Sequence, residues 1–115
     1  MKKILLVEDM KVVHDSVKDA LAGKVKLISA FTISEAKRLF QKNPDIDAIV
    51  IDACVPGEVI NTLPLVRELR KEYKGLMIAI SKYGDYQKQL VEAGCNKRCF
   101  NKRQLSEYLS ELLYL

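Results

Sequence analysis

The sequence has few cysteines and only one histidine, which limits the classes of site it can hold. Cysteine occurs three times in 115 residues, and His14 is the single histidine. An odd cysteine count, with no secretory leader expected, indicates reduced thiols. Cys95 and Cys99 are spaced closely enough for a metal-binding pair, but no second cysteine pair or second histidine completes a zinc site. We therefore expect neither disulfides nor structural zinc.

A long apolar run is also missing. The first residues, MKKILLVEDM, place two lysines before an apolar run, as a signal peptide does. Glu8 and Asp9 end that run far short of a signal-peptide core, and no later segment approaches the length of a membrane span. We therefore expect a cytoplasmic protein with no membrane partner.

The composition is that of an ordinary globular domain. The chain is 49% hydrophobic and 30% charged, and its length is typical of one domain with a substantial core. It contains no recognisable linker, repeat or low-complexity segment. The net charge of +4 is mild and is not concentrated in a long basic stripe, so a nucleic-acid partner is not expected.

Short apolar runs rich in β-branched residues alternate with segments of helical spacing. Strands are predicted at residues 4–7, 25–30, 48–51 and 76–80, with a weaker candidate at 98–100. Helical patterns follow each strand; Thr62 is predicted to cap the third helix, and the last helix is predicted to bury a leucine-rich stripe. Five strands alternating with five helices predict an α/β fold with a parallel sheet covered on both faces. The chain is too short for an eight-stranded barrel, which leaves an open doubly wound sheet.

Polar residues stand where the predicted strands end. Glu8 and Asp9 follow the first strand, Asp52 ends the third and Ser81 follows the fourth. Ligands of open α/β sheets bind beyond the carboxyl ends of the strands. Three carboxylates that converge there need a positive partner, and their oxygens suit Mg²⁺. A carboxylate beside such an ion can act as a nucleophile toward a phosphoryl donor.

A mononucleotide-binding protein or a small flavodoxin-like enzyme is the other α/β candidate. It would need a turn rich in Gly, Ser or Thr after the first strand to cradle a phosphate. The sequence VEDMKVVHD places carboxylates there instead, and these repel phosphate without a metal. We therefore reject this alternative.

Four motifs in this order carry a resemblance that covers nearly the whole chain. They are ILLVED, IVIDACVPG, IAIS and EAGCNK, and an amphipathic last helix follows them. The chain thus resembles a response-regulator receiver domain, the phosphoacceptor module of two-component signalling. The resemblance implies a flavodoxin-like fold with strand order 2-1-3-4-5. It also implies a single receiver domain over residues 1–115 without an output domain, phosphorylated by a histidine kinase or phosphotransfer protein, and not an enzyme beyond its own phosphorylation and dephosphorylation.

The resemblance also assigns roles to individual residues. Asp52 would be the aspartate that accepts the phosphoryl group. Glu8 and Asp9 would hold Mg²⁺ together with Asp52 and the backbone carbonyl of Cys54. Ser81 would donate a hydrogen bond to the phosphoryl group and move when that group arrives.

The chain departs from the family after the fifth strand, where a Lys-Pro pair is expected. Asn101 and Lys102 occupy these two positions, and asparagine carries no charge. A cis bond before a residue other than proline costs about 2.5–4 kcal/mol, so another loop path is expected. Two hypotheses remain open for the missing cation. Lys102 reaches the site along a re-routed loop, or Lys82, directly after Ser81, reaches across to Asp52.

Other departures concern switching and partners. Arg98 stands where the family commonly has an aromatic switch residue, and Tyr83 and Cys54 occupy positions that tune hydrolysis in the family. The basic stretch KRCFNKR is either a solvated rim or a docking surface for an acidic protein. In the family, that surface is formed by helix four, strand five and helix five. The alternative to a phosphorylated receiver is a pseudo-receiver, an interaction module that works without phosphate.

Overall fold

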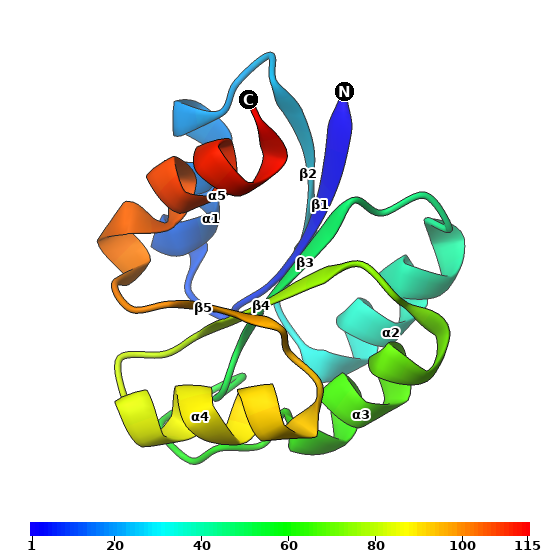
Figure 1. Ribbon diagram of the computed structural model, residues 1–115, viewed down its shortest axis with the longest axis vertical. Coiled ribbons are helices and arrows are strands. Elements are labelled where there is room, and N and C mark those ends of the chain that lie inside the picture. The colour runs from blue at the N-terminus through cyan, green and yellow to red at the C-terminus, as the bar shows by residue number, and fades with distance from the viewer.

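Five parallel strands form one sheet at the centre of the molecule. The computed structural model describes residues 1–115, and its strand order is β2-β1-β3-β4-β5 (Figure 1). The strands are β1 (Lys2–Val7), β2 (Val25–Ala30), β3 (Ala48–Asp52), β4 (Leu76–Ile80) and β5 (Lys97–Cys99). The predicted flavodoxin-like α/β fold and its strand order are confirmed.

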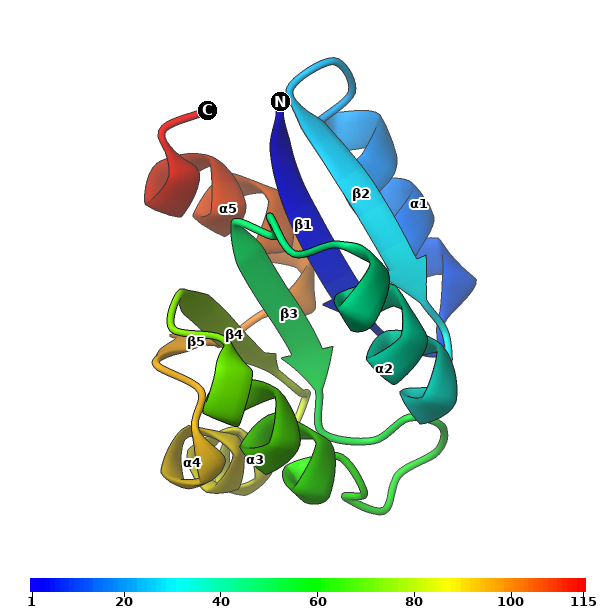
Figure 2. The same ribbon diagram turned by 90° about the vertical axis from the view of Figure 1, so that its right-hand side faces the viewer.

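Helices cover both faces of the sheet. They are α1 (Lys11–Ala20), α2 (Ile33–Lys42), α3 (Leu63–Glu72), α4 (Gly84–Ala93) and α5 (Leu105–Leu113), with a 3₁₀ turn, η1 (Lys102–Gln104), before α5. Side chains from α1 and α5 pack on one face, and those from α2, α3 and α4 pack on the other. Figure 2 shows α2 and α3 on the near side of the sheet. No helix has both the length and the apolar character that crossing a membrane requires.

The central strand β3 explains how an acid reaches the edge of the sheet. All five of its residues are buried, because β1 and β4 pair with it and helices cover both faces. Asp52 is the last of these residues and lies opposite Ile80 at the end of β4. The hydrophobic residues before Asp52 therefore hold its carboxylate at a defined place beside the end of β1.

Thr62 differs from the sequence prediction. It occupies the N-cap position of α3, but its side chain accepts no hydrogen bond from the helix. Its buried hydroxyl instead donates to the backbone carbonyls of Asp52 (2.8 Å) and Ala53 (3.0 Å). The predicted capping bond was therefore wrong, because two buried carbonyls of the β3–α3 loop compete for the same hydroxyl.

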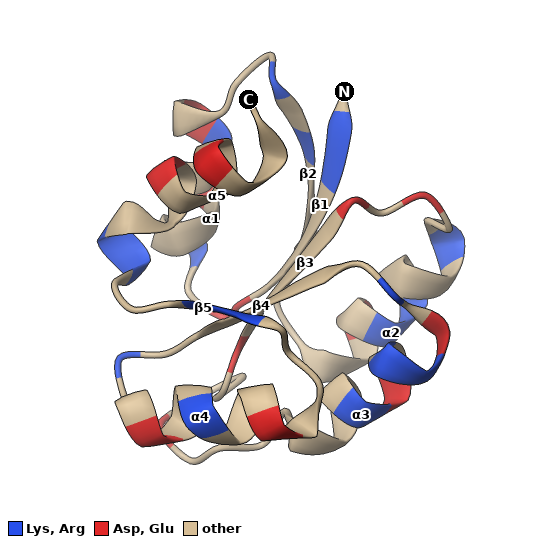
Figure 3. Cartoon of the chain, viewed as in Figure 1, with Lys and Arg blue, Asp and Glu red and all other residues tan.

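Charged residues are spread over the whole surface. Figure 3 shows Lys and Arg on β1, β2 and β5 and on helices of both faces, interspersed with Asp and Glu. The fold therefore gathers no single basic stripe of the kind that follows a nucleic-acid backbone.

Candidate functional site

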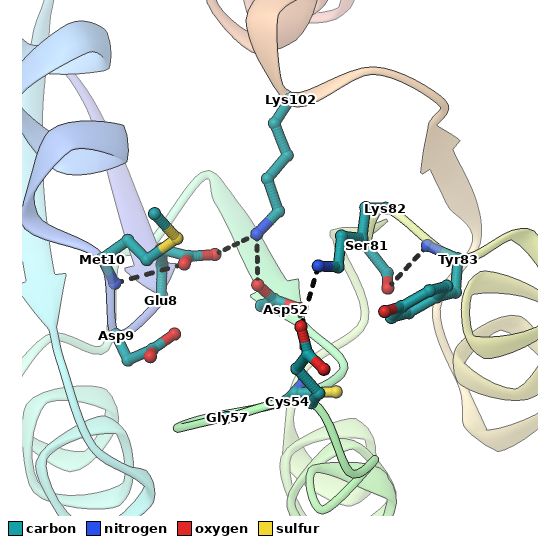
Figure 4. Close-up of a pocket in the computed structure, with 11 residues that line it drawn as sticks. Glu8, Asp9, Met10, Asp52, Cys54, Gly57, Ser81, Lys82, Tyr83 and Lys102 are labelled. Carbon is teal, nitrogen blue, oxygen red and sulfur yellow. Dashed lines mark hydrogen bonds and ion pairs between the residues drawn. The ribbon is translucent and has the colours of Figure 1, made fainter.

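A polar cavity of about 220 Å³ lies at the carboxyl ends of the central strands. Figure 4 shows its walls, which come from the ends of β1, β3 and β4 and from the turn before α5. The cavity is lined by Glu8, Asp9, Met10, Asp52, Cys54, Gly57, Glu58, Ser81, Lys82, Tyr83 and Lys102. The structure thus brings together all of the predicted site residues except Asn101.

Three carboxylates converge in this cavity. Glu8, Asp9 and Asp52 each offer an oxygen, and these oxygens lie within 4.8 Å of one another. Glu8 is fully buried, whereas Asp9 is half-buried and its carboxylate has no hydrogen-bond or ion-pair partner. Oxygen donors at this spacing suit a hard divalent cation. The chemistry of the donor set therefore fits the metal that the sequence pattern predicted.

Burial makes Glu8 an unusual carboxylic acid. The pKa of Glu8 is raised from 4.5 to about 8, chiefly by removal from water and then by the neighbouring Asp52 carboxylate, although Lys102 opposes both effects. The backbone N–H of Met10 donates to Glu8 Oε1 at 3.2 Å. Without a metal ion in the cavity, Glu8 therefore holds its proton up to a pH at which an exposed glutamate is fully ionised.

His14 supports the acidic end of β1, a role that the sequence did not suggest. Its Nε2 lies 2.7 Å from the Glu8 backbone carbonyl, and its Nδ1 lies 2.9 Å from Ser29 Oγ. A carbonyl only accepts, so Nε2 carries the proton and Nδ1 accepts from Ser29. Burial lowers the pKa of His14, although the bond to Glu8 opposes this shift. The only sequence signal was its helical spacing from Val17, which places both side chains on the face of α1 that packs on the sheet.

The loop after β3 holds the carboxylate of Asp52 in place. The Cys54 N–H donates to Asp52 Oδ1 at 3.2 Å. The Asn61 side chain makes two bonds of 2.8 Å with the backbone of Val55, one accepted from its N–H and one donated to its carbonyl. Together with the bond from Thr62 to the Asp52 carbonyl, these contacts tie both ends of the loop to the end of β3. The acidic group is therefore preorganised rather than free to rotate.

Lys102 is the cation that lies against the acids. Its Nζ is 2.5 Å from Asp52 Oδ2 and 3.0 Å from Glu8 Oε2. Burial lowers the pKa of Lys102, but the hydrogen bonds and attraction from Asp52 and Glu8 outweigh burial, so the net shift is upward. The ammonium group therefore remains charged and supplies the positive partner for both acidic side chains.

The backbone after β5 explains why Lys102, and not Asn101, reaches the cavity. The Asn101 side chain accepts a bond of 2.9 Å from the backbone N–H of Arg103, and so begins the η1 turn. The Asn101–Lys102 peptide bond is trans, and the only cis bond in the chain is Val55–Pro56. The η1 turn directs Lys102 back toward the ends of β1 and β3 (Figure 4).

Lys82 and Ser81 lie on the β4 side of the cavity. Lys82 pairs with Glu58 at 3.0 Å, not with Asp52, and both side chains are largely exposed. Ser81 is buried, and its Oγ accepts a bond of 3.1 Å from the Tyr83 backbone N–H. The Ser81 hydroxyl hydrogen thus remains available to a ligand in the cavity.

Comparisons with known proteins agree with this architecture. No protein-family model and no curated protein matches the sequence. The non-phosphorylated HemR receiver domain from Leptospira biflexa is 27% identical over 99% of this chain and 93% of its own, with a TM-score of 0.75. A two-component response regulator from Clostridium difficile superposes with a TM-score of 0.80 at 16% identity, over 99% of this chain and 97% of its own. This chain has the fold of a response-regulator receiver domain.

In this receiver fold, a buried amide links the end of β4 to β5. Gln87 of α4 donates to the backbone carbonyls of Ser81 (2.7 Å) and Cys99 (3.1 Å). Its Oε1 accepts from Arg98 Nε at 3.3 Å, and the Arg98 guanidinium lies 4.7 Å from the centre of the Phe100 ring. Arg98 was identifiable from the sequence, but Gln87 was not. Glutamine is usually exposed, and its burial is decided only when α4 packs against the sheet.

No cysteine thiol of this receiver fold belongs to the cluster of possible metal-binding side chains. All three are free and buried. Burial raises the pKa of Cys95 to about 12 and also raises that of Cys54. Cys54 lines the cavity, but a thiol with a raised pKa is a poor nucleophile and a poor metal ligand at neutral pH.

Proposed function

We propose that this chain is a phosphoacceptor receiver of a two-component phosphorelay, phosphorylated on Asp52. A histidine kinase or a phosphotransfer protein would supply the phosphoryl group, and the modification would change which partner the chain binds. The observation that carries this proposal is the convergence of an acidic triplet and a charged lysine at one cavity, with Asp52 bonded to Lys102 and adjoining Glu8 and Asp9.

The chain's own residues suit the transfer step. The Asp52 carboxylate would attack the phosphorus of a phosphohistidine; a new O–P bond forms, the P–N bond breaks, and the imidazole keeps the electron pair and takes up a proton. Lys102 donates a hydrogen bond to Asp52 and would neutralise charge on the incoming phosphoryl oxygens. Ser81 can donate its free hydroxyl hydrogen to one of those oxygens.

Magnesium is the ion that this donor set favours, and Glu8, Asp9, Asp52 and the Cys54 carbonyl would hold it. When bound, the ion neutralises the negative charge on the carboxylates and the phosphoryl group. The chain would act on no separate substrate, so its catalysis would be limited to its own phosphorylation and dephosphorylation.

The surface formed by α4, β5 and α5 is the proposed partner-binding face. Lys97 and Arg103 are exposed there, and Phe100 is 73% exposed beside Arg98. Lys102 belongs to the acidic cavity instead, so the basic stretch is divided between the site and the surface. An exposed aromatic ring among positive charges suits an acidic protein partner.

Phosphorylation by a small phosphodonor tests the proposal directly. The wild-type protein with phosphoramidate and Mg²⁺ is expected to gain the mass of one phosphate, and hydroxylamine, which cleaves acyl phosphates, is expected to remove it. The Asp52→Asn variant is expected to gain nothing. Intact-protein mass spectrometry measures both results. No gain in the wild type would contradict the proposal and would favour the phosphate-independent pseudo-receiver.

Tyr83 is expected to prolong the lifetime of the phosphoryl group. Its ring lines the cavity and packs edge-on against Tyr86, with ring centres 5.2 Å apart. Removing the ring opens the cavity to water, so Tyr83→Ala is expected to lose phosphate severalfold faster than the wild type. Tyr114→Ala is the matched control, because Tyr114 is 95% exposed and does not line the cavity. Equal decay rates in the Tyr83 variant and the wild type would refute this role.

A further inference from the structure

Two lysines, Lys102 and Lys82, line the cavity, but they pair with different acidic residues. Lys102 is half-buried and already bonded to two buried carboxylates. Lys82 approaches from the end of β4, and its side chain extends toward the β3–α3 loop (Figure 4). Its only acidic partner is Glu58, at 3.0 Å. The Lys82 ammonium therefore lies at the edge of the cavity and makes no ion pair with Glu8, Asp9 or Asp52.

The pair of Lys82 and Glu58 joins two loops across the cavity. Glu58 belongs to the β3–α3 loop, and its backbone carbonyl accepts a bond of 3.3 Å from Tyr86 Oη in α4. The Lys82 ammonium also lies 5.2 Å from the centre of the Tyr83 ring. Both charged side chains are more than 60% exposed. An ion pair so exposed is weak, because water screens it, and a stronger anion can displace the carboxylate.

We infer that Lys82 is a second phosphoryl-binding residue, which Glu58 holds at the rim until a phosphoryl group occupies Asp52. The inference rests on the proposed function, since it requires Asp52 to carry the group. A phosphoryl group adds about two negative charges and three acceptor oxygens. Lys82 directly follows Ser81, so the hydroxyl and ammonium donors enter the cavity from adjacent positions of the same strand end.

The transfer of Lys82 from Glu58 to the phosphoryl group would also affect the β3–α3 loop. When Lys82 turns to the phosphoryl oxygens, Glu58 loses its only ion pair. The hydrogen bond from Tyr86 Oη to the Glu58 backbone carbonyl is then the one side-chain bond that still ties α4 to this part of the β3–α3 loop. Phosphorylation would thereby loosen the β3–α3 loop from the turn between β4 and α4, in addition to any movement of Ser81.

Beryllofluoride binding in the presence of Mg²⁺ tests the inference, because this anion mimics a phosphoryl group on an aspartate. Apparent affinity is measured by ¹⁹F NMR titration. Lys82→Met is expected to weaken binding about fivefold, and Glu58→Gln to strengthen it about twofold by releasing Lys82. Glu58→Gln in the Lys82→Met background is expected to change nothing. Lys88→Met and Glu92→Gln make the same charge changes at exposed positions of α4 and are expected to match the wild type.

The outcomes separate the two proposals. Wild-type protein that binds no beryllofluoride contradicts the proposed function and overturns this inference with it. Wild-type binding that Lys82→Met leaves unchanged overturns only the role of Lys82. An effect of Glu58→Gln that persists in the Lys82→Met background also overturns it, since the carboxylate would then repel the anion directly. Lys82 and Glu58 are exposed, so circular dichroism is expected to show all variants folded.

Discussion

Replacing Lys102 with methionine is expected to slow phosphorylation of Asp52 by roughly 100-fold, comparable to the loss of one preorganised donor to a developing charge. Lys102 is the only cation that contacts Asp52, at 2.5 Å, and it also bonds Glu8 at 3.0 Å. Methionine keeps much of the side-chain length but removes the charge. The initial rate of mass gain with phosphoramidate and Mg²⁺ measures the effect.

Two further variants make the test of Lys102 specific. Lys97→Met removes an exposed charge from β5, outside the cavity, and is expected to keep the wild-type rate. Adding Asn101→Lys to Lys102→Met restores a lysine at the position usual for the family, but it is not expected to restore the rate. The side chain of residue 101 faces the backbone of Arg103 and not the cavity. A Lys102→Met variant that is phosphorylated at the wild-type rate would contradict the assigned role.

The metal-free protein is expected to become less stable as the pH rises from about 4.5 to about 8. The pKa of Glu8 is about 8 in the folded state and 4.5 ordinarily. Between these values the folded state binds more protons than the unfolded state, so raising the pH favours unfolding. The expected loss attributable to Glu8 is about 4 kcal/mol in the free energy of unfolding. Urea denaturation in the presence of EDTA, repeated across this pH range, measures it.

The Glu8→Gln variant isolates this effect. Its amide cannot ionise, so the wild type is expected to lose stability relative to the variant as the pH rises toward 8. His14 has a lowered pKa and favours unfolding as the pH falls through its ordinary value of 6.5, but both proteins contain it. Mg²⁺ is expected to restore wild-type stability above pH 8, because it binds the ionised carboxylates of the folded state. Equal pH dependence in the two proteins without metal would contradict the buried position of Glu8.

The sequence by itself determined the fold and the acidic half of the site. Alternating β-branched runs and amphipathic segments allow only a parallel sheet with helices on both faces. Each central strand is buried along its length, so the residue that follows its last apolar position must emerge at the carboxyl edge. The hydrophobic pattern therefore placed Glu8, Asp9, Asp52 and Ser81 at one edge of the sheet, and the strand order that the receiver resemblance implies made their strands neighbours.

The tertiary structure alone decided which lysine meets the acids and what holds the acids in place. Lys82 and Lys102 were equivalent candidates in the sequence, because a long flexible side chain reaches many positions and a loop's path depends on local hydrogen bonds. The bond between Asn101 and the Arg103 backbone starts a 3₁₀ turn that directs Lys102 inward, while Glu58 holds Lys82 at the rim. The supporting roles of His14 and Gln87 also appeared only after packing, because burial of a polar side chain depends on partners distant in the sequence.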